Sequence, residues 1–286
     1  MNSSTRKMPE LDQAALQRAG KKIVVNGIEL DVVVMGEGPD VLLVHGFPDD
    51  RSVWRKQIPA LVAAGYRVIV PDTRGCGESD APLGTRAYRI EEHMADLVGT
   101  LDALGVEKVK LIGHDWGAVL SWQFCMAHPE RVERYAALSV GHPTAYAKGP
   151  LEQKIKGYYV FLIQLRGFIE WALRAGHWWL FRTIVRHAEC DYYIQRLSRP
   201  GRLTAALNYY RANFAKLIFP PEYPSVAMPV LGIHSTSDNY LAARQMTDTA
   251  RYVKGAFRYE SIPGASHWLQ LDAPEQVNAL LLDFLQ

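Results

Sequence analysis

The chain has 286 residues, of which 48% are hydrophobic and 22% charged, and its formal net charge is +2. This composition is ordinary for a globular protein, and a chain of this length can bury a large core without disulfide or metal staples. The small net charge argues against nucleic acid as the main partner.

Targeting and compartment signals are few. Residues 1–9 are polar and contain no apolar core, which argues against a secretory signal. The longest apolar stretches have strand length or are interrupted by Arg, so no membrane span is expected. The three cysteines, Cys76, Cys125 and Cys190, do not form a disulfide framework and favour a reducing compartment, the cytoplasm.

Short apolar runs alternate with helix-length segments along most of the chain. The runs at 22–25 and 28–35 are expected to pair as an antiparallel hairpin around Asn26-Gly27, a strong turn signal. The further predicted strands are 41–44, 68–70, 109–112, 229–233 and 258–262. The predicted helices are 51–64, 90–104, 116–128, 241–253 and 274–285. This alternation predicts an α/β fold with a mostly parallel sheet and helices on both faces.

The alternation stops between residues 145 and 221. This stretch is rich in Tyr, Trp, Phe and Arg and has helical periodicity. One helical face is expected to carry Tyr159, Leu162, Leu165, Phe168, Ile169 and Ala172. Double proline at 220–221 stops a helix, and the strand pattern resumes at residue 229. We therefore expect a core in two parts, 1–144 and 222–286, and an inserted helical cap at 145–221.

Positive charge is concentrated in the cap. Between Lys148 and Lys216 there are twelve Lys and Arg residues against four Asp and Glu residues. The ordinary interpretation is a solvated, Arg-rich helical face, and the alternative is a surface that attracts anions or a membrane. The aromatic cap is also a candidate surface for pairing with a second copy of the chain.

The segment Gly113-His114-Asp115-Trp116-Gly117 lies where a predicted strand ends and a helix begins. Gly-x-nucleophile-x-Gly is the pattern of a nucleophile elbow, a turn whose flanking positions must lack side chains. A carboxylate attacks saturated carbon and forms an alkyl ester, so Asp115 at the centre predicts displacement rather than ester hydrolysis. The alternative role for an Asp at a strand end is to cap the next helix.

With these motifs the chain resembles the epoxide hydrolases of the α/β-hydrolase fold, from about Lys21 to its end. The motifs that carry the resemblance are His45-Gly46-Phe47-Pro48, residues 72–80, Gly113 to Gly117, Asn208-Tyr209-Tyr210-Arg211 and His267-Trp268. Each is short, and their order and spacing are specific together. The resemblance implies an eight-stranded, mostly parallel sheet with an inserted cap. It also implies a hydrolase, acting on ether bonds, that opens epoxides to vicinal diols through an ester on Asp115.

Such an ester must be cleared by water, for which His is the usual base at neutral pH. His267 follows the last predicted strand, the terminal place in the order nucleophile, acid, His. Asp238 follows the strand at 229–233 and is the expected acid that fixes the tautomer of His267. The loop at 140–143, which supplies the acid in some relatives, has no carboxylate. The alternative interpretations are a surface His and an Asp in an Asx turn.

The fold pattern assigns the oxyanion hole to the backbone N–H groups of Phe47 and Trp116. The side chains of these two residues and of Trp268 are expected to line the pocket. The Phe47–Pro48 bond is a candidate for a cis peptide, since X-Pro bonds tolerate it. His45 is interpreted as a structural hydrogen-bonding residue rather than a base.

The resemblance further implies two cap tyrosines that protonate the epoxide oxygen. Tyr210, which precedes an Arg, and Tyr159, which precedes a Val, match the family positions. Tyr209 and Tyr158 are the alternatives if the register is shifted by one residue. Tyrosines on amphipathic cap helices are also common as packing residues.

The expected partners are a small epoxide and water. No cofactor and no metal are expected, because the sequence has no zinc-ligand spacing, dinucleotide fingerprint or P-loop. The closest alternative is a haloalkane or haloacid dehalogenase with the same Asp115, His267 and Asp238. The halide that leaves in a dehalogenase needs two N–H donors. Trp116 would serve as one, but position 47, where a second donor is expected, is Phe. A non-catalytic ligand-binding relative is disfavoured because no triad member is missing.

Overall fold

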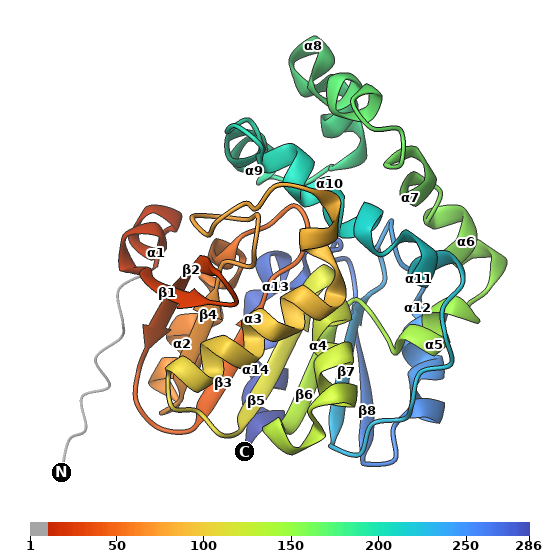
Figure 1. Cartoon of the computed structure of the whole chain (residues 1–286). Coiled ribbons are helices and arrows are strands. Elements are labelled where there is room, and N and C mark those ends of the chain that lie inside the picture. The colour runs from red at the N-terminus through yellow and green to blue at the C-terminus, as the bar shows by residue number, and fades with distance from the viewer. Residues whose placement is uncertain (1–10) are drawn as a thin grey trace.

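The computed structural model describes residues 11–286 (Figure 1). Segment 1–9, in which no secretory signal is expected, lies outside the described residues. One sheet of eight strands has the order β1-β2-β4-β3-β5-β6-β7-β8. Its strands are β1 (Lys21–Val25), β2 (Ile28–Met35), β3 (Asp40–Val44), β4 (Arg67–Pro71), β5 (Val109–His114), β6 (Val132–Leu138), β7 (Val230–Ser235) and β8 (Phe257–Ile262). The pairs β1–β2 and β2–β4 are antiparallel and the rest parallel, which confirms the predicted sheet.

Helices cover both faces of the sheet, as predicted (Figure 1). The helical elements of the core are α1 (Gln13–Ala19), η1 (Arg51–Trp54), α2 (Ile58–Ala63), η2 (Thr85–Tyr88), α3 (Ile90–Ala103), α4 (Trp116–Ala127), η3 (Pro129–Arg131), α12 (Ala243–Thr247), η4 (Asp248–Tyr252), α13 (Leu269–Asp272) and α14 (Pro274–Leu285). Alternation along β3 shows the two layers. Val41 and Leu43 pack in the apolar cluster that contains α2 and α14, whereas Leu42 and Val44 pack in the cluster of α3 and α4.

The local predictions differ from the structure in a few places. The hairpin at Asn26-Gly27 is confirmed, with both residues at positive φ (48° and 74°), as a tight two-residue hairpin turn needs. The predicted helix at 51–64 is instead η1 followed by α2, and the one at 241–253 is α12 followed by η4. The predicted strands did not include β6, which completes the sheet between β5 and β7.

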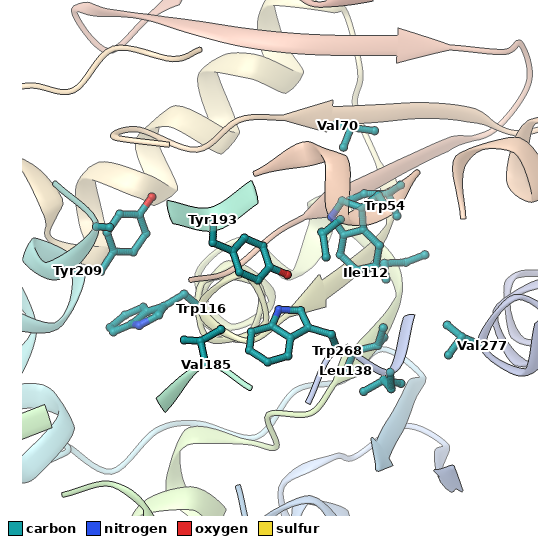
Figure 2. Packing of buried hydrophobic residues seen from close by; sticks show 14 of the residues in the cluster. Trp54, Val70, Ile112, Trp116, Leu138, Val185, Tyr193, Tyr209, Trp268 and Val277 are labelled. Carbon is teal, nitrogen blue, oxygen red and sulfur yellow. The ribbon is translucent and has the colours of Figure 1, made fainter. Parts of the chain in front are cut away.

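The chain between β6 and β7 is helical. It contains α5 (Pro143–Ala147), α6 (Leu151–Lys156), α7 (Tyr159–Leu162), α8 (Phe168–Ile184), α9 (Cys190–Leu197), α10 (Arg202–Ala212) and α11 (Phe214–Ile218). Figure 1 shows α6 to α10 gathered above one edge of the sheet. Val185, Tyr193 and Tyr209 of this segment share one apolar cluster with Trp116 and Trp268, so the segment packs directly onto the residues around the sheet (Figure 2).

The single apolar face expected for 159–172 is wrong. Gly167, at φ 74°, separates α7 from α8, so the two helices do not share one periodicity. Leu162, Leu165 and Phe168 are 44%, 50% and 58% exposed, whereas Ile169 is buried. Among residues 11–286, no helix has both the length and the apolar character needed to cross a bilayer.

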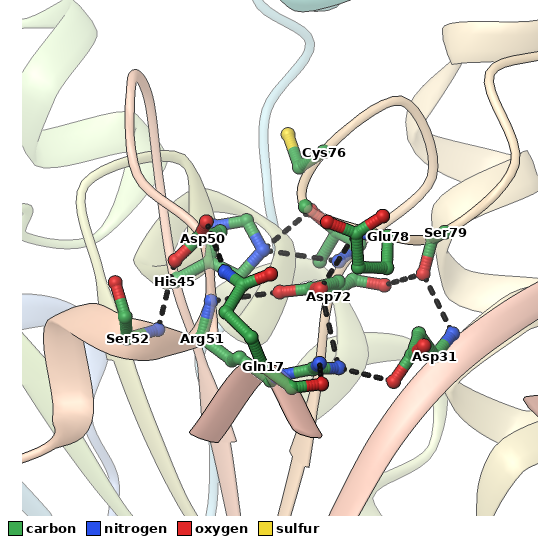
Figure 3. A network of polar contacts seen from close by, with 12 residues as sticks. Gln17, Asp31, His45, Asp50, Arg51, Ser52, Asp72, Cys76, Glu78 and Ser79 are labelled. Atoms are coloured by element: carbon green, nitrogen blue, oxygen red, sulfur yellow. Dashed lines mark hydrogen bonds and ion pairs between the residues drawn. The ribbon is translucent and has the colours of Figure 1, made fainter. Parts of the chain in front are cut away.

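A buried polar network holds the loops that follow β3 and β4 (Figure 3). The Arg51 side chain, fully buried, pairs with Asp31 and Asp72. The Asp72 carboxylate also accepts hydrogen bonds from the backbone N–H groups of Arg51 (2.8 Å) and Glu78 (2.9 Å). His45 Nε2 accepts a hydrogen bond from Thr73 N at 3.0 Å, which agrees with a structural role for this ring. The network therefore fixes the start of the loop that carries Phe47.

Candidate active site

Asp115 lies on a sharp turn between β5 and α4. Its backbone has φ 53° and ψ −123°, a conformation that L residues rarely adopt. Such strain costs on the order of 1–3 kcal/mol and persists only where the surroundings enforce it. The turn presents the Asp115 carboxylate at the carboxyl end of β5, with 16% of the side chain exposed.

The two flanking glycines make this turn possible. A methyl group on Gly117 would overlap the backbone carbonyls of Val44 and His45, and one on Gly113 would press against the first turn of α4. A methyl group added at a third glycine, Gly46, would lie against the side chain of Asp115. Close packing of three backbone segments, rather than flexibility, therefore explains why these positions are Gly.

We expect Gly117→Ala to destabilise the fold by about 1–3 kcal/mol, because the overlapping atoms belong to backbone that cannot move aside. Urea unfolding followed by circular dichroism measures this loss. Gly157→Ala is the matched control: its φ is −82° and the nearest atom to an added methyl lies at 3.4 Å, so the change should stay within about 1 kcal/mol. Equal midpoints for both variants would contradict the packing argument.

The Asp115 carboxylate is held by backbone donors and faces an imidazole. The N–H of Phe47 donates to Oδ1 at 2.7 Å, and the N–H of Trp116 also hydrogen-bonds the carboxylate. Nε2 of His267 lies 3.4 Å from Oδ2. Burial alone would raise the pKa of Asp115, but its hydrogen bond to His267 and the His267 charge outweigh burial and lower that pKa. Asp115 is therefore ionised at neutral pH.

His267 lies between two carboxylates. Its Nδ1 donates to Asp238 Oδ2 at 2.8 Å, and Asp238 Oδ1 accepts from the backbone N–H groups of Tyr240 (2.8 Å) and Leu241 (2.9 Å). Burial would lower the pKa of His267, but the charges of Asp238 and Asp115 raise it to about 10. The imidazolium in turn lowers the pKa of the buried Asp238 to about 2. The three predicted triad residues are thus brought together in one charge network.

The loop that carries His267 is anchored through its backbone. The carbonyl oxygen of His267 accepts hydrogen bonds from His114 Nε2 (2.9 Å) and Ser139 Oγ (3.2 Å). Burial and the nearby His267 lower the pKa of His114 to about 3, so this ring is neutral. His114 directly precedes Asp115 in the sequence, but no local pattern indicated this contact.

The loop that carries Asp238 is held by α6. Lys156 of α6 donates to the carbonyl oxygens of Asp238 (2.8 Å) and Leu241 (3.2 Å), and the buried Gln153 bonds to Tyr240 O and Ala242 N. These contacts span more than 80 residues of sequence, and sequence reasoning did not predict them.

Two cavities meet above Asp115. One has a lining that includes Trp116, Val119 and Leu241; we call it the core arm. The other is lined by aliphatic and aromatic residues, most of them from the segment between β6 and β7, together with Phe47, His267 and Trp268; we call it the cap arm. Asp115, Tyr159 and Tyr210 line both arms. Phe47, Trp116 and Trp268 thus lie at the pocket, where the sequence analysis placed them.

Tyr159 and Tyr210 converge on this junction from α7 and α10. Their ring centroids are 5.8 Å apart, and Tyr210 also packs edge-on against Trp116 (5.0 Å) and Phe47 (5.7 Å). Burial, with the Asp115 charge contributing, raises the pKa of both phenols, so both are protonated. Two hydroxyl donors and one carboxylate therefore line the same junction.

The register alternatives are placed differently. The hydroxyl of Tyr209 donates to Arg74 O at 2.7 Å and lies 2.8 Å from Thr73 Oγ1, so it is engaged with the loop after β4. Tyr158 lines the cap arm only and is 56% exposed. Of the four candidates, only Tyr159 and Tyr210 line both cavities.

A further buried carboxyl group, that of Asp49, contacts the pocket residue Trp268. Trp268 Nε1 donates to Asp49 Oδ2 at 3.1 Å, and the Trp268 ring packs edge-on against His267 (5.3 Å). Burial raises the pKa of Asp49 to about 8, so the group is largely neutral at pH 7. Asp49 follows Pro48 of a cis peptide, as expected for the Phe47–Pro48 bond. Within residues 11–286, no three His, Cys, Asp or Glu side chains converge as a metal ion requires.

Comparisons with known proteins agree with this architecture. A family model described as "alpha/beta hydrolase fold" matches residues 39–177. Epoxide hydrolase 3 of Xenopus tropicalis is 34% identical over 280 residues, covering 91% of this chain and 76% of that protein. Epoxide hydrolase A of Mycobacterium tuberculosis is also 34% identical and covers 91% of this chain and 95% of that protein.

Solved structures show the same similarity in three dimensions. The crystal structure of epoxide hydrolase A from Mycobacterium thermoresistibile superposes with a TM-score of 0.80 at 32% identity, covering 93% of this chain and 97% of that one. The Bacillus megaterium epoxide hydrolase, solved with an inhibitor, gives a TM-score of 0.84 at 26% identity, covering 93% and 99%. This chain therefore belongs to the epoxide hydrolase family of the α/β-hydrolase fold.

Proposed function

We propose that the chain hydrolyses epoxides to vicinal diols, with Asp115 as the nucleophile. The observation that carries the proposal is the junction of the two arms, where an ionised carboxylate on a strained elbow faces two protonated phenols. A carboxylate supplies the electron pair for attack at carbon, and a phenol supplies the hydrogen bond that an epoxide oxygen needs to leave.

The first step forms an ester. An Asp115 oxygen attacks one ring carbon, a C–O bond forms, and the C–O bond to the ring oxygen breaks. Tyr159 and Tyr210 hydrogen-bond the ring oxygen and supply its proton, because they are the protonated donors at the junction. The product is a β-hydroxyalkyl ester of Asp115. We propose that the helical segment 145–221 acts as the cap that presents both tyrosines.

The second step clears the ester. His267 takes a proton from water, and the resulting hydroxide attacks the ester carbonyl carbon of Asp115. The carbonyl oxygen becomes an oxyanion that the N–H groups of Phe47 and Trp116 stabilise, as they already contact the carboxylate. Collapse releases the diol and leaves one water oxygen in the Asp115 carboxylate. Asp238 stabilises the imidazolium formed in this step.

Ester formation itself switches His267 to its basic form. In the resting site, the Asp115 charge helps to raise the pKa of His267. The ester is neutral, so this contribution disappears and the pKa of His267 falls. The proton it then gives up balances the proton that the phenols have supplied to the ring oxygen. Base and nucleophile are therefore active in successive steps rather than together.

Isotope labelling tests the proposal. The chain is incubated with an excess of styrene oxide in ¹⁸O-water over many turnovers, digested, and its peptides weighed by mass spectrometry. We expect label in the peptide that contains Asp115, because hydroxide attacks the ester carbonyl there. Label in the diol with none in that peptide would indicate direct attack of water on the epoxide. Release of halide from a haloalkane with no turnover of epoxide would favour a dehalogenase.

Replacing the hydroxyl of Tyr210 or Tyr159 by hydrogen should slow ester formation. We expect Tyr210→Phe and Tyr159→Phe each to lower the single-turnover rate about 10²-fold, the usual effect of losing one donor to a developing oxyanion. Stopped-flow tryptophan fluorescence measures this rate. Tyr209→Phe is the control: its hydroxyl bonds to the loop after β4, so it should cost about 0.5–1.5 kcal/mol of stability and leave the rate unchanged. The same rate loss in Tyr209→Phe would contradict the assigned register.

The three cysteines are unpaired. On that basis we propose a reducing compartment, the cytoplasm, as the location of the enzyme.

A further inference from the structure

The helical segment between β6 and β7 carries a set of exposed, large apolar side chains. We call it the outer cap face and define it by Ile155, Phe161, Leu165, Phe168, Trp171 and Trp179. Each of these side chains is 50–67% exposed; Leu165 lies between α7 and α8, and the others lie on α6, α7 and α8. Figure 1 shows these three helices forming the outer margin of the cap. Exposed large apolar residues gathered in this way usually mark an interaction surface.

The same helices carry uncompensated positive charge. Lys154, Arg166 and Arg174 are exposed, and none of them has a carboxylate within 4 Å among the described residues. Of the acidic residues on these helices, Glu170 is paired with Arg211 and Glu152 with Lys156. The outer cap face therefore has cations without ion pairs beside its aromatic side chains. These cations are part of the excess of Lys and Arg found in the sequence of this segment.

The outer cap face adjoins the cap arm. Leu162 of α7 and Tyr158, the residue before α7, line that arm, yet Tyr158 is 56% and Leu162 44% exposed. The arm therefore reaches the surface beside the residues of the outer cap face. From there, aliphatic side chains such as Leu173 and Ile184 continue inward to Asp115. An apolar molecule released at this surface would meet mainly aliphatic and aromatic side chains until it reached the junction.

We propose that the outer cap face docks on an anionic phospholipid surface, from which apolar epoxides enter the cap arm. The docking rests on the exposed face alone, and its use in substrate delivery rests on the proposed function. Tryptophan and other aromatic residues favour the interfacial zone of a bilayer, and Lys and Arg are attracted by anionic headgroups. A second copy is a poorer occupant, because a two-fold interface would place these unpaired cations opposite each other with no carboxylates to meet them.

Vesicle sedimentation with the full chain tests the docking. Vesicles of phosphatidylcholine alone are compared with vesicles of equal parts phosphatidylcholine and phosphatidylglycerol. We expect binding to the anionic vesicles, weakened by salt, and little binding to the neutral ones. Each neutralised cation should weaken binding about 5-fold, so Lys154→Gln with Arg174→Gln should lose about 25-fold. Trp171→Ser with Trp179→Ser should also lose most of the binding.

Matched controls lie elsewhere on the surface. Lys108, the residue before β5, is exposed and forms no ion pair with residues 11–286, and Leu83 is 97% exposed. Lys108→Gln and Leu83→Ser should bind vesicles like the unchanged chain. All variants should hydrolyse a small water-soluble epoxide at the unchanged rate, which shows that they fold. Hydrolysis of an epoxide dissolved in anionic vesicles should slow in the outer cap face variants only.

Several outcomes would overturn the proposal. Absence of binding to anionic vesicles, or equal loss in the control variants, rules out docking through this face. A dimer in light scattering that Trp171→Ser with Trp179→Ser dissociates, with no vesicle binding, identifies the face as an interface between copies. Vesicle binding is measured without substrate, and Asp115→Asn should bind equally. Docking without epoxide turnover would therefore refute the proposed function and leave the surface assignment intact.

Discussion

Asp115→Asn should abolish epoxide hydrolysis while leaving the fold in place. The Asn carbonyl oxygen can still accept the hydrogen bond from Phe47 N, so the elbow keeps its main contact. A neutral amide is a poor nucleophile, and loss of a nucleophile typically lowers kcat by about 10⁵- to 10⁶-fold. Turnover of styrene oxide, followed by diol formation, measures the effect. Asp115→Ala is a second variant in which no side-chain atom can attack.

The same substitution has an electrostatic consequence that a purely structural role would not produce. Asp115 is one of two carboxylates that raise the pKa of His267 to about 10. Removing its charge destabilises the imidazolium, so the pKa of His267 should fall in Asp115→Asn. Titration of the His267 ring by NMR measures the shift, and the surface residue His128 serves as the reference. An unchanged pKa of His267 together with an unchanged rate of epoxide hydrolysis would show that Asp115 is not the nucleophile.

Much of the core was predictable because its signals are local. Asn26-Gly27 fixes a hairpin by its own backbone preferences, and the buried strands β3, β5 and β7 appear as short apolar runs. The elbow is recognisable because Gly113 and Gly117 flank the nucleophile at fixed spacing, although the contacts that require Gly117 come from the β3 segment. Asp238 and His267 follow predicted strands, and parallel strands place their carboxyl ends at one edge of the sheet. The fold that these segments indicate is that of the epoxide hydrolase family, to which the chain belongs.

The missed elements have less distinctive sequences. Strand β6 contains Ala136 and Ala137 at its buried centre and charged residues at its start, so it lacks the β-branched run that marks its neighbours. Between β6 and β7, helical periodicity in the sequence continues across Gly167, although α7 ends before this residue and α8 begins after it. Periodicity indicates which residues lie on one face only while a helix is continuous, so it could not predict that Phe168 is exposed.

The supporting contacts of the site could not be predicted, because tertiary packing creates them. Lys156 and Gln153 reach the Asp238 loop from more than 80 residues away. The Trp268 indole meets Asp49 across 219 residues. No spacing within the sequence encodes such pairs. The choice between Tyr209 and Tyr210 likewise depends on which side of α10 faces the cavity, and adjacent residues on a helix point about 100° apart.

His267→Gln should let the ester accumulate. Ester formation needs only Asp115 and the phenols, so it should continue, whereas hydrolysis loses its general base. We expect kcat to fall about 10³- to 10⁴-fold. Mass spectrometry of the intact chain after mixing with epoxide should show a gain equal to the mass of one epoxide, and digestion should place it on the Asp115 peptide. His128→Gln is the control and should show no adduct.

The rate of ester hydrolysis should increase with pH if His267 is the base. Only neutral His267 can accept a proton from water, so the rate should rise with pH and level off above the pKa of His267 in the ester. That pKa must lie below the value of about 10 in the free site, because the Asp115 charge is absent. In Asp238→Asn a second charge is lost, so the profile should shift further towards low pH while the plateau falls. Identical profiles in both forms, or rapid turnover by His267→Gln, would show that another group activates the water.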